Sequence, residues 1–302
     1  MGHPHFRGAF LWTILVPVLA ACGGDNPAEL PRPIPPIGNR ATADRPAETS
    51  GSQIHIIYMV PADGKDTGID TTGRLENSVG SFQNWLVGKV GKRIRQDTYQ
   101  GRLDISFFKS SKADADIAAS GQSILRNLYD ELHAAGFDDP ATKYLIYYDG
   151  TNPNTCGNAF RDGPAAALYL RGSANGKSCI GRFVTSPDAH PGYWEFAMLH
   201  EILHTLGMVD AKAPHHDATR PLHVEDGEDL MHGGGGTWLP DFVDRDNDDY
   251  YGDSVPSNAR NLRNDPILVS APAAAIARAQ AQLTRPRFIP HFVHEVLEFK
   301  KP

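Results

Sequence analysis

The sequence predicts an α+β domain built on a mixed, mostly parallel twisted sheet with helices packed against it. Apolar runs of strand length alternate with helical patterns across residues 54–148, an order typical of parallel strands joined through helices. The segment 193–206 is apolar nearly all round, which indicates a helix buried in the core. A glycine-rich stretch follows at residues 233–236, where we expect a loop.

The individual elements follow from their apolar spacing. We expect strands, in chain order, at residues 54–60, 103–108, 143–148, 166–170 and 182–185. The first run is β-branched and almost wholly apolar, as in a strand buried on both faces. We expect helices, in the same order, at residues 75–87, 123–135, 193–206 and 273–282. In the first of these, Leu75, Val79 and Phe82 recur at the spacing of a core-facing stripe.

Residues 1–21 are expected to be a lipoprotein signal peptide. Arg7 gives a short positive region, and the apolar run at residues 9–20 is too short to cross a membrane. The run ends in Leu-Ala-Ala-Cys, which resembles the bacterial lipobox, so Cys22 is expected to carry a lipid. The alternative is a plain signal peptide with Cys22 incidental. The sequence therefore predicts export and a lipid anchor at the cell envelope, on the outer membrane or cell surface.

Residues 22–52 are expected to form a tether, because they are rich in proline and poor in apolar residues. The folded domain is then expected to span residues 53–302. The net charge of −7 argues against nucleic-acid binding, which favours a basic surface. No pattern in the sequence indicates an oligomeric state.

Two cysteines remain beside Cys22, namely Cys156 and Cys179. In an oxidising compartment we expect them to form a disulfide, which stabilises a fold by about 3 kcal/mol through loop closure. The alternative is two buried free thiols.

The stretch HEILHTLGMVD at residues 200–210 carries the chemistry. His200 and His204 are four residues apart, so both imidazoles lie on one face of a helix and can bind one zinc ion. Glu201 then lies beside the metal, where a carboxylate acts as general base toward a zinc-bound water. Gly207 is expected to end the helix and return the chain, with Asp210, toward the ion. Three protein ligands and one open position are typical of catalytic zinc.

The third ligand is the part of the site that spacing constrains least. Asp210 is expected to be the third ligand because of its position in the motif, and the alternatives are His215, His216 and His223. For residues 200–210 as a whole, the alternative to a metal site is a buried helix whose histidines are satisfied by hydrogen bonds in the core.

The pattern HExxHxxGxxD, followed by Asp229-Leu230-Met231 and four glycines after His232, resembles the metzincin clan of zinc endopeptidases. Within the clan it is closest to the small secreted snapalysin type, in which aspartate replaces the usual third histidine. The resemblance covers residues 193–236. It implies a metzincin-like zincin domain, an active-site helix followed by a Met-turn at Met231, and hydrolysis of protein or peptide substrates. An ordinary core methionine is the alternative for Met231.

A second polar cluster lies downstream. Asp244, Asp246 and Asp248 alternate as the oxygen ligands of calcium loops do. The match to an EF-hand fails at Asp249, where that loop needs glycine, and at Val255, where it needs glutamate. A structural calcium site and a solvated acidic turn are therefore equal alternatives here.

Together these features predict an extracytoplasmic zinc metalloendopeptidase. The alternative from another class is a non-catalytic surface lipoprotein, stabilised by a metal, that acts as a binding protein. Glu201 favours the enzyme, since a purely structural zinc site needs no base beside a water.

Overall fold

The computed structural model describes residues 1–2, 40–174, 176–179, 181–233 and 238–284. The expected signal peptide after residue 2, Cys22 and most of the expected tether lie outside the described residues. The described residues from 40 onward belong to one compact unit, which spans 36–302. Among them, no helix combines the length and the apolar character that crossing a membrane requires.

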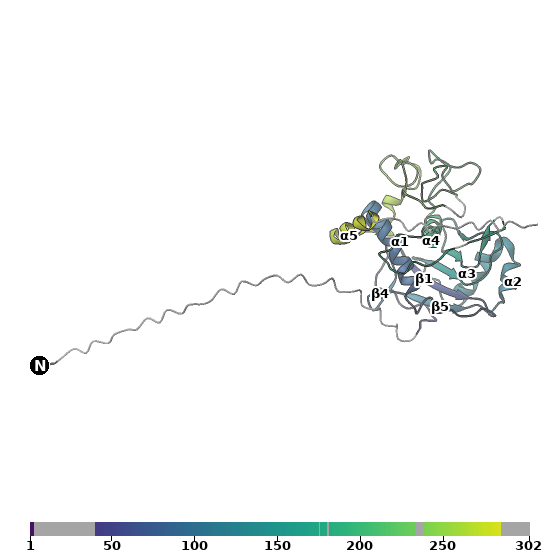
Figure 1. Ribbon diagram of the computed structural model, residues 1–302, viewed down its shortest axis with the longest axis horizontal. Helices are drawn as coiled ribbons and strands as arrows, with labels where there is room; N and C mark the ends of the chain where they lie inside the picture. The colour runs from purple at the N-terminus through teal and green to yellow at the C-terminus, as the bar shows by residue number, and fades with distance from the viewer. Residues whose placement is uncertain (3–39, 175, 180, 234–237, 285–302) are drawn as a thin grey trace, which may run out of the picture. The chain divides into compact units, whose positions relative to one another are not determined.

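A five-stranded sheet forms the centre of the domain (Figure 1). Its strands are β5 (Ile105–Lys109), β1 (Gln53–Val60), β6 (Thr142–Tyr148), β8 (Ala165–Tyr169) and β7 (Gly157–Ala159), in that spatial order. The first four are mutually parallel, and β7 runs antiparallel to β8 at the edge. All residues of β1 are buried, as its apolar sequence predicts. The expected mixed, mostly parallel sheet is confirmed.

Helices cover both faces of this sheet. One core cluster joins Ile54, Ile56 and Tyr58 of β1 to α1 (Arg74–Val90) and α4 (Tyr193–Thr205). The other joins Ile57 and Met59 to α3 (Ile124–Ala134). Successive side chains of a strand point to opposite faces, so the apolar run of β1 supplies both clusters. Figure 1 shows α1 and α4 together, away from α3.

The remaining elements are short or peripheral. Two helices, α2 (Asp114–Ala118) and α5 (Ala273–Leu283), and two 3₁₀ turns, η1 (Gly121–Ser123) and η2 (Leu262–Asn264), complete the helical part. Three two-stranded pairs complete the strands: β2 (Lys92–Ile94) with β11 (Leu268–Ser270), β3 (Thr98–Tyr99) with β4 (Arg102–Leu103), and β9 (Ser173–Ala174) with β10 (Lys177–Ser178).

The strand expected at residues 182–185 is wrong, because the structure has no strand there. The backbone N–H of Val184 donates to the carboxylate of Glu195, 3.5 Å away. The ring of Phe183 packs edge-on against Trp194 at a centroid distance of 4.8 Å. Phe183 thus packs between Trp194 in the first turn of α4 and Tyr147 of β6, 6.0 Å away between ring centroids, and the segment itself forms no strand.

Part of the expected tether lies against the domain. Ala41 forms a parallel bridge with Ser106 of β5, and the N–H of Phe107 donates to the carbonyl of Ala41 at 2.8 Å. The segment 40–49 therefore covers the β5 edge of the sheet. Among the described strands, the opposite edge of this sheet is β7, which pairs with β8 on one side.

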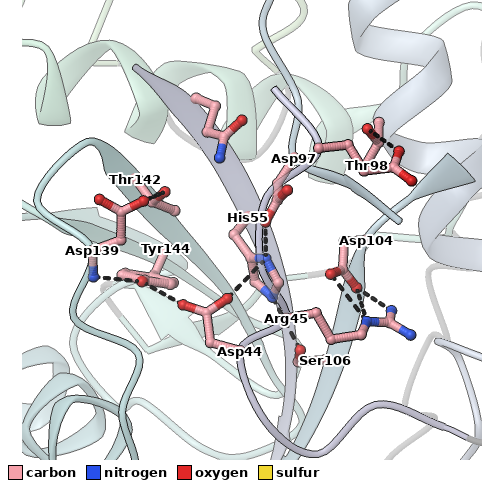
Figure 2. Close-up of polar contacts among 12 residues, drawn as sticks. Asp44, Arg45, His55, Asp97, Thr98, Asp104, Ser106, Asp139, Thr142 and Tyr144 are labelled. Carbon is pink, nitrogen blue, oxygen red and sulfur yellow. Dashed lines mark hydrogen bonds and ion pairs between the residues drawn. The ribbon is translucent and has the colours of Figure 1, made fainter. Parts of the chain in front are cut away.

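The same segment is held by polar contacts to buried residues of the domain (Figure 2). Asp44 accepts a hydrogen bond from the hydroxyl of Tyr144 at 2.8 Å, and Arg45 pairs with the fully buried Asp104. His55 of β1 lies beside Asp44, with its two ring nitrogens hydrogen-bonded to Asp97 and Ser106. These contacts make residues 40–49 part of the folded unit.

Candidate metal centre

Helix α4 presents the HEILH stretch from inside the core. Its first turn is closed by Glu195, whose carboxylate accepts the backbone N–H of Gly192 at 3.0 Å. Every residue from Glu195 to Thr205 is buried, in keeping with the apolar sequence. The helix ends at Thr205, and Gly207 follows with a φ of 70°, the left-handed conformation that glycine adopts without strain.

His200 and His204 meet at their Nε2 atoms, which lie 3.0 Å apart. The Nδ1–H of His200 donates to the carbonyl of Leu230 at 2.7 Å. This bond fixes the tautomer and leaves the Nε2 lone pair of His200 free for a metal. Nδ1 of His204 is buried and has no hydrogen-bond partner among the described residues.

His223 completes a group of three imidazoles. Its ring centroid lies 5.1 Å from that of His200 and 4.9 Å from that of His204. One ring nitrogen of each histidine lies within 4.8 Å of the others. Nδ1 of His223 donates to the carbonyls of Arg220 and Pro221, both at 3.2 Å, so its Nε2 is also free. Three neutral imidazole nitrogens form a donor set that suits zinc.

A short hairpin brings His223 to the helix. His216 forms an antiparallel bridge with Val224, and the N–H of Asp217 donates to the carbonyl of His223 at 2.8 Å. Val224 in turn bonds to the carbonyl of Met231 at 3.1 Å. The hairpin is thus attached to the segment that also orients His200.

Asp210 does not join the two helix histidines in this arrangement. It belongs to none of the groups of potential metal ligands found among the described residues, and its Oδ1 accepts the N–H of Lys212 at 2.7 Å. Val209, before it, has a φ of 58°, so the chain turns again after Gly207. His215 pairs with Asp249 and His216 lies in the hairpin. Of the four residues considered from sequence, His223 is therefore the one beside the pair.

Burial sets the charge of these groups. It is the main cause that lowers the pKa of His200 to about 3, and the neighbouring His223 lowers it further. Burial also lowers the pKa of His204 well below its usual value. The imidazoles are therefore neutral near pH 7, the form that binds metals. Burial raises the pKa of Glu201 to about 8, so without a nearby cation its carboxyl holds a proton at neutral pH.

Met231, the expected Met-turn residue, is fully buried. Its N–H donates to Asp229 Oδ1 at 2.8 Å, and Asp229 also accepts the hydroxyl of the buried Tyr250. Burial raises the pKa of Asp229 to about 8. Trp238 donates its ring N–H to the carbonyl of Asp229 at 3.0 Å. These bonds fix residues 229–231, whose carbonyls orient His200 and the hairpin.

Strand β7 runs beside Glu201, a neighbour that sequence reasoning missed. A Cβ atom at Gly157 would lie 2.9 Å from Oε1 of Glu201, so only glycine fits here without displacing the carboxylate. The segment Gly157-Asn158-Ala159 has no β-branched residue that would signal a strand. The disulfide Cys156–Cys179, predicted from cysteine number, is confirmed. It ties the start of β7 to the end of β10.

The three aspartates of the predicted calcium loop separate into different groups. Asp244 is buried, and its Oδ2 accepts three backbone N–H groups, at 2.7–3.1 Å. Asp246 lies with His215 and Asp226, whereas Asp248 lies with His215 and Asp249.

Comparison with solved structures gives distant likenesses. No protein-family model and no curated protein matches the chain. Archaemetzincin from Methanopyrus kandleri aligns at 15% identity over 76% of this chain and 96% of its own, with a TM-score of 0.33. OgpA from Akkermansia muciniphila aligns at 17% identity over 68% of this chain and 60% of its own, with a TM-score of 0.35.

Catalytically inactive OgpA, in complex with an O-glycopeptide substrate, gives 16% identity over 68% of this chain and 59% of its own, with a TM-score of 0.34. The chain thus spans about 60% of the length of OgpA. Likenesses at this level assign no family.

Proposed function

We propose that this protein is a zinc-dependent endopeptidase in which His200, His204 and His223 hold the metal. The observation that carries the proposal is the group of three buried imidazoles, with Glu201 on the same helix as two of them. Zinc bound there would polarise a peptide carbonyl and lower the pKa of a water molecule. Three protein ligands leave one position open for substrate chemistry.

Glu201 is the proposed proton carrier. Burial raises its carboxyl pKa to about 8, and a divalent cation nearby would lower that pKa again. Its carboxylate then accepts a proton from the attacking water and later donates it to the departing amine. A group with a pKa close to the working pH performs both transfers well.

We propose that the substrate binds along β7, the terminal strand of the sheet. At the other edge of the sheet, β5 already pairs with Ala41. An extended peptide can pair with the outer side of β7, where it would displace the hydroxyl of Thr155 from the carbonyl of Gly157, because main-chain groups at a sheet edge accept an added strand. Gly157 would then hold the peptide backbone close to Glu201. A strand edge binds chain on both sides of the cleaved bond, which favours an endopeptidase.

Export, lipidation of Cys22 and anchoring at the cell envelope are part of the same proposal. The lipobox-like Leu-Ala-Ala-Cys stretch supports them. Mass spectrometry of the cell-envelope protein tests them, since the mature chain should begin at a lipid-bearing Cys22. An N-terminus at any other residue would contradict this part.

The activity is tested with a peptide library and the Glu201→Gln variant. We expect the zinc-loaded parent to cleave internal peptide bonds and the variant to retain its zinc. Cleavage by the variant should be slower by about 10²–10⁴-fold, the usual contribution of general acid–base catalysis. A parent that binds zinc but cleaves no peptide would favour the alternative, a metal-stabilised binding protein.

A further inference from the structure

The turn at residues 217–223 holds His223 through its own backbone. The N–H of Asp217 donates to the carbonyl of His223 at 2.8 Å, and the N–H of His223 donates to the carbonyl of Arg220 at 3.2 Å. The ring bonds to the same turn, since Nδ1 of His223 lies 3.2 Å from the carbonyls of Arg220 and Pro221. The conformation of this turn therefore decides where the free Nε2 of His223 points.

Asp217 fixes the turn with both carboxylate oxygens. Its Oδ1 accepts the N–H and the hydroxyl of Thr219, at 2.8 and 2.6 Å, and also the N–H of Arg220 at 3.1 Å. Its Oδ2 accepts the Nε–H of Arg220 at 2.7 Å. Asp217 is only 4% exposed, so little water competes for these bonds. A carboxylate that accepts four donors in this way holds the backbone of residues 217–220 in one conformation.

Arg220 joins the turn to the segment that follows Met231. Its Nε binds Asp217, and its Nη1 donates to the carbonyl of Gly233. The planar guanidinium presents its donors in a rigid fork, so the two bonds together fix the direction of the side chain. A Cβ atom at Gly233 would lie 3.1 Å from Cδ of Arg220 and 3.1 Å from Cγ of His223. The backbone of Gly233 thus packs against the arginine and the histidine together.

The residue before His223 is strained. Leu222 has a φ of 74°, a left-handed conformation that is unfavourable for a residue with a bulky side chain. Such a conformation persists only where the surrounding contacts determine it. Here the bond from the N–H of Asp217 to the carbonyl of His223 closes the turn around Leu222. Without the bonds of Asp217, relaxation of Leu222 would turn the ring of His223 away from the helix.

We propose that Asp217 and Arg220 are positioning residues, which hold the His223 imidazole with Nε2 toward the helix histidines before any metal binds. The proposal rests on the proposed zinc centre, in which His223 is the ligand outside the helix. A side chain that is already held in place loses less conformational entropy when the metal binds. Removing groups that orient metal ligands commonly lowers metal affinity by about 10–100-fold.

Arg220→Met is the variant that separates positioning from simple electrostatics. By charge alone, loss of a nearby cation would strengthen the binding of zinc. Loss of positioning should instead raise the Kd for zinc by about 10–100-fold, measured by competition with a chromophoric chelator. Arg263→Met is the matched control, because Arg263 is also ion-paired and is 44% exposed against 45% for Arg220, and it should leave the Kd unchanged. Unchanged or tighter zinc binding by Arg220→Met overturns the proposal.

A double-mutant cycle tests whether Asp217 acts through His223. Asp217→Ala should raise the Kd for zinc by about 10–100-fold in the parent and should have little further effect once His223 is replaced by alanine. An equal loss of affinity in both backgrounds overturns the proposal, since it would show that the substitution damages the helix histidines as well. Circular dichroism is the control for folding, and Arg220→Met, which changes a half-exposed side chain, keeps the test decisive if Asp217→Ala does not fold.

Imidazole NMR of the metal-free protein gives a readout that does not depend on zinc. At neutral pH, His223 of the parent should be a single Nδ1–H tautomer, because that nitrogen donates to two carbonyls. Asp217→Ala should show exchange between both tautomers, and an unchanged single tautomer overturns the proposal. If the parent holds the ring in this way but binds no zinc, the proposed peptidase fails and the positioning of His223 stands.

Discussion

Replacing His223 by alanine should remove most of the zinc affinity. In the structure His223 supplies one of three imidazoles with ligand atoms within 4.8 Å of each other. Four-ligand zinc sites bind with about 10–16 kcal/mol, or roughly 2.5–4 kcal/mol per ligand. Loss of one ligand should then raise the Kd for zinc by about 10²–10³-fold.

Asp210→Ala is the matched comparison. Its carboxylate accepts the N–H of Lys212, so its removal should cost about 1 kcal/mol of stability and leave zinc binding unchanged. Competition with a chromophoric zinc chelator measures both variants, with circular dichroism as the control for folding. If Asp210→Ala loses zinc and His223→Ala keeps it, the ligand assignment is refuted and the spacing-based expectation is restored.

Three further predictions concern the surroundings of the site. Gly157→Ala puts a Cβ 2.9 Å from Glu201 Oε1 and should lower kcat/KM at least tenfold without loss of zinc. The control Gly227→Ala has open space around it and should leave kcat/KM unchanged. Equal kcat/KM values for the two variants would be inconsistent with a Glu201 held beside β7. Arg45→Ala leaves the buried Asp104 unpaired and should lower the free energy of unfolding, measured in urea, by about 3–5 kcal/mol. A loss below about 1 kcal/mol would show that the ion pair does not hold residues 40–49 against the domain. In the metal-free protein the pKa of Glu201 is about 8 in the folded state against 4.5 in the unfolded chain, so the free energy of unfolding falls as the pH rises from 4.5 through 8. Glu201→Gln should therefore stabilise the metal-free protein more at pH 8 than at pH 5. An equal effect at both pH values would contradict the raised pKa.

The sequence predicted those parts of the fold that depend on local pattern. The apolar run of β1 and the all-round apolar helix α4 are both buried as expected. The pairing of His200 with His204 follows from helix periodicity alone. The disulfide followed from an even number of available cysteines. Each of these features depends either on residues close together in the sequence or, for the disulfide, on the number of cysteines.

The third imidazole depends on a hairpin that no local pattern reveals. Spacing favoured Asp210, but the left-handed residues Gly207 and Val209 turn the chain away. His223 returns 13 residues later, because Val224 pairs with Met231 and His232. Likewise β7 has no strand-like composition, since its place at the sheet edge comes from pairing with β8. The segment 182–185 has strand-like composition but lacks a neighbouring strand to pair with.

The contacts of residues 40–49 were also hidden in the sequence. Proline-rich composition correctly marks a chain with little apolar material, but ion pairs such as that of Arg45 with Asp104 join residues far apart in sequence. Charge pairs of this kind carry no periodic signal.

Anomalous diffraction at the zinc absorption edge, from crystals of the zinc-loaded protein, tests the central claim most directly. The account predicts a peak bounded by the Nε2 atoms of His200, His204 and His223, with the remaining position open beside Glu201. A peak bounded by Asp210 in place of His223, or no peak between the helix histidines, would contradict it.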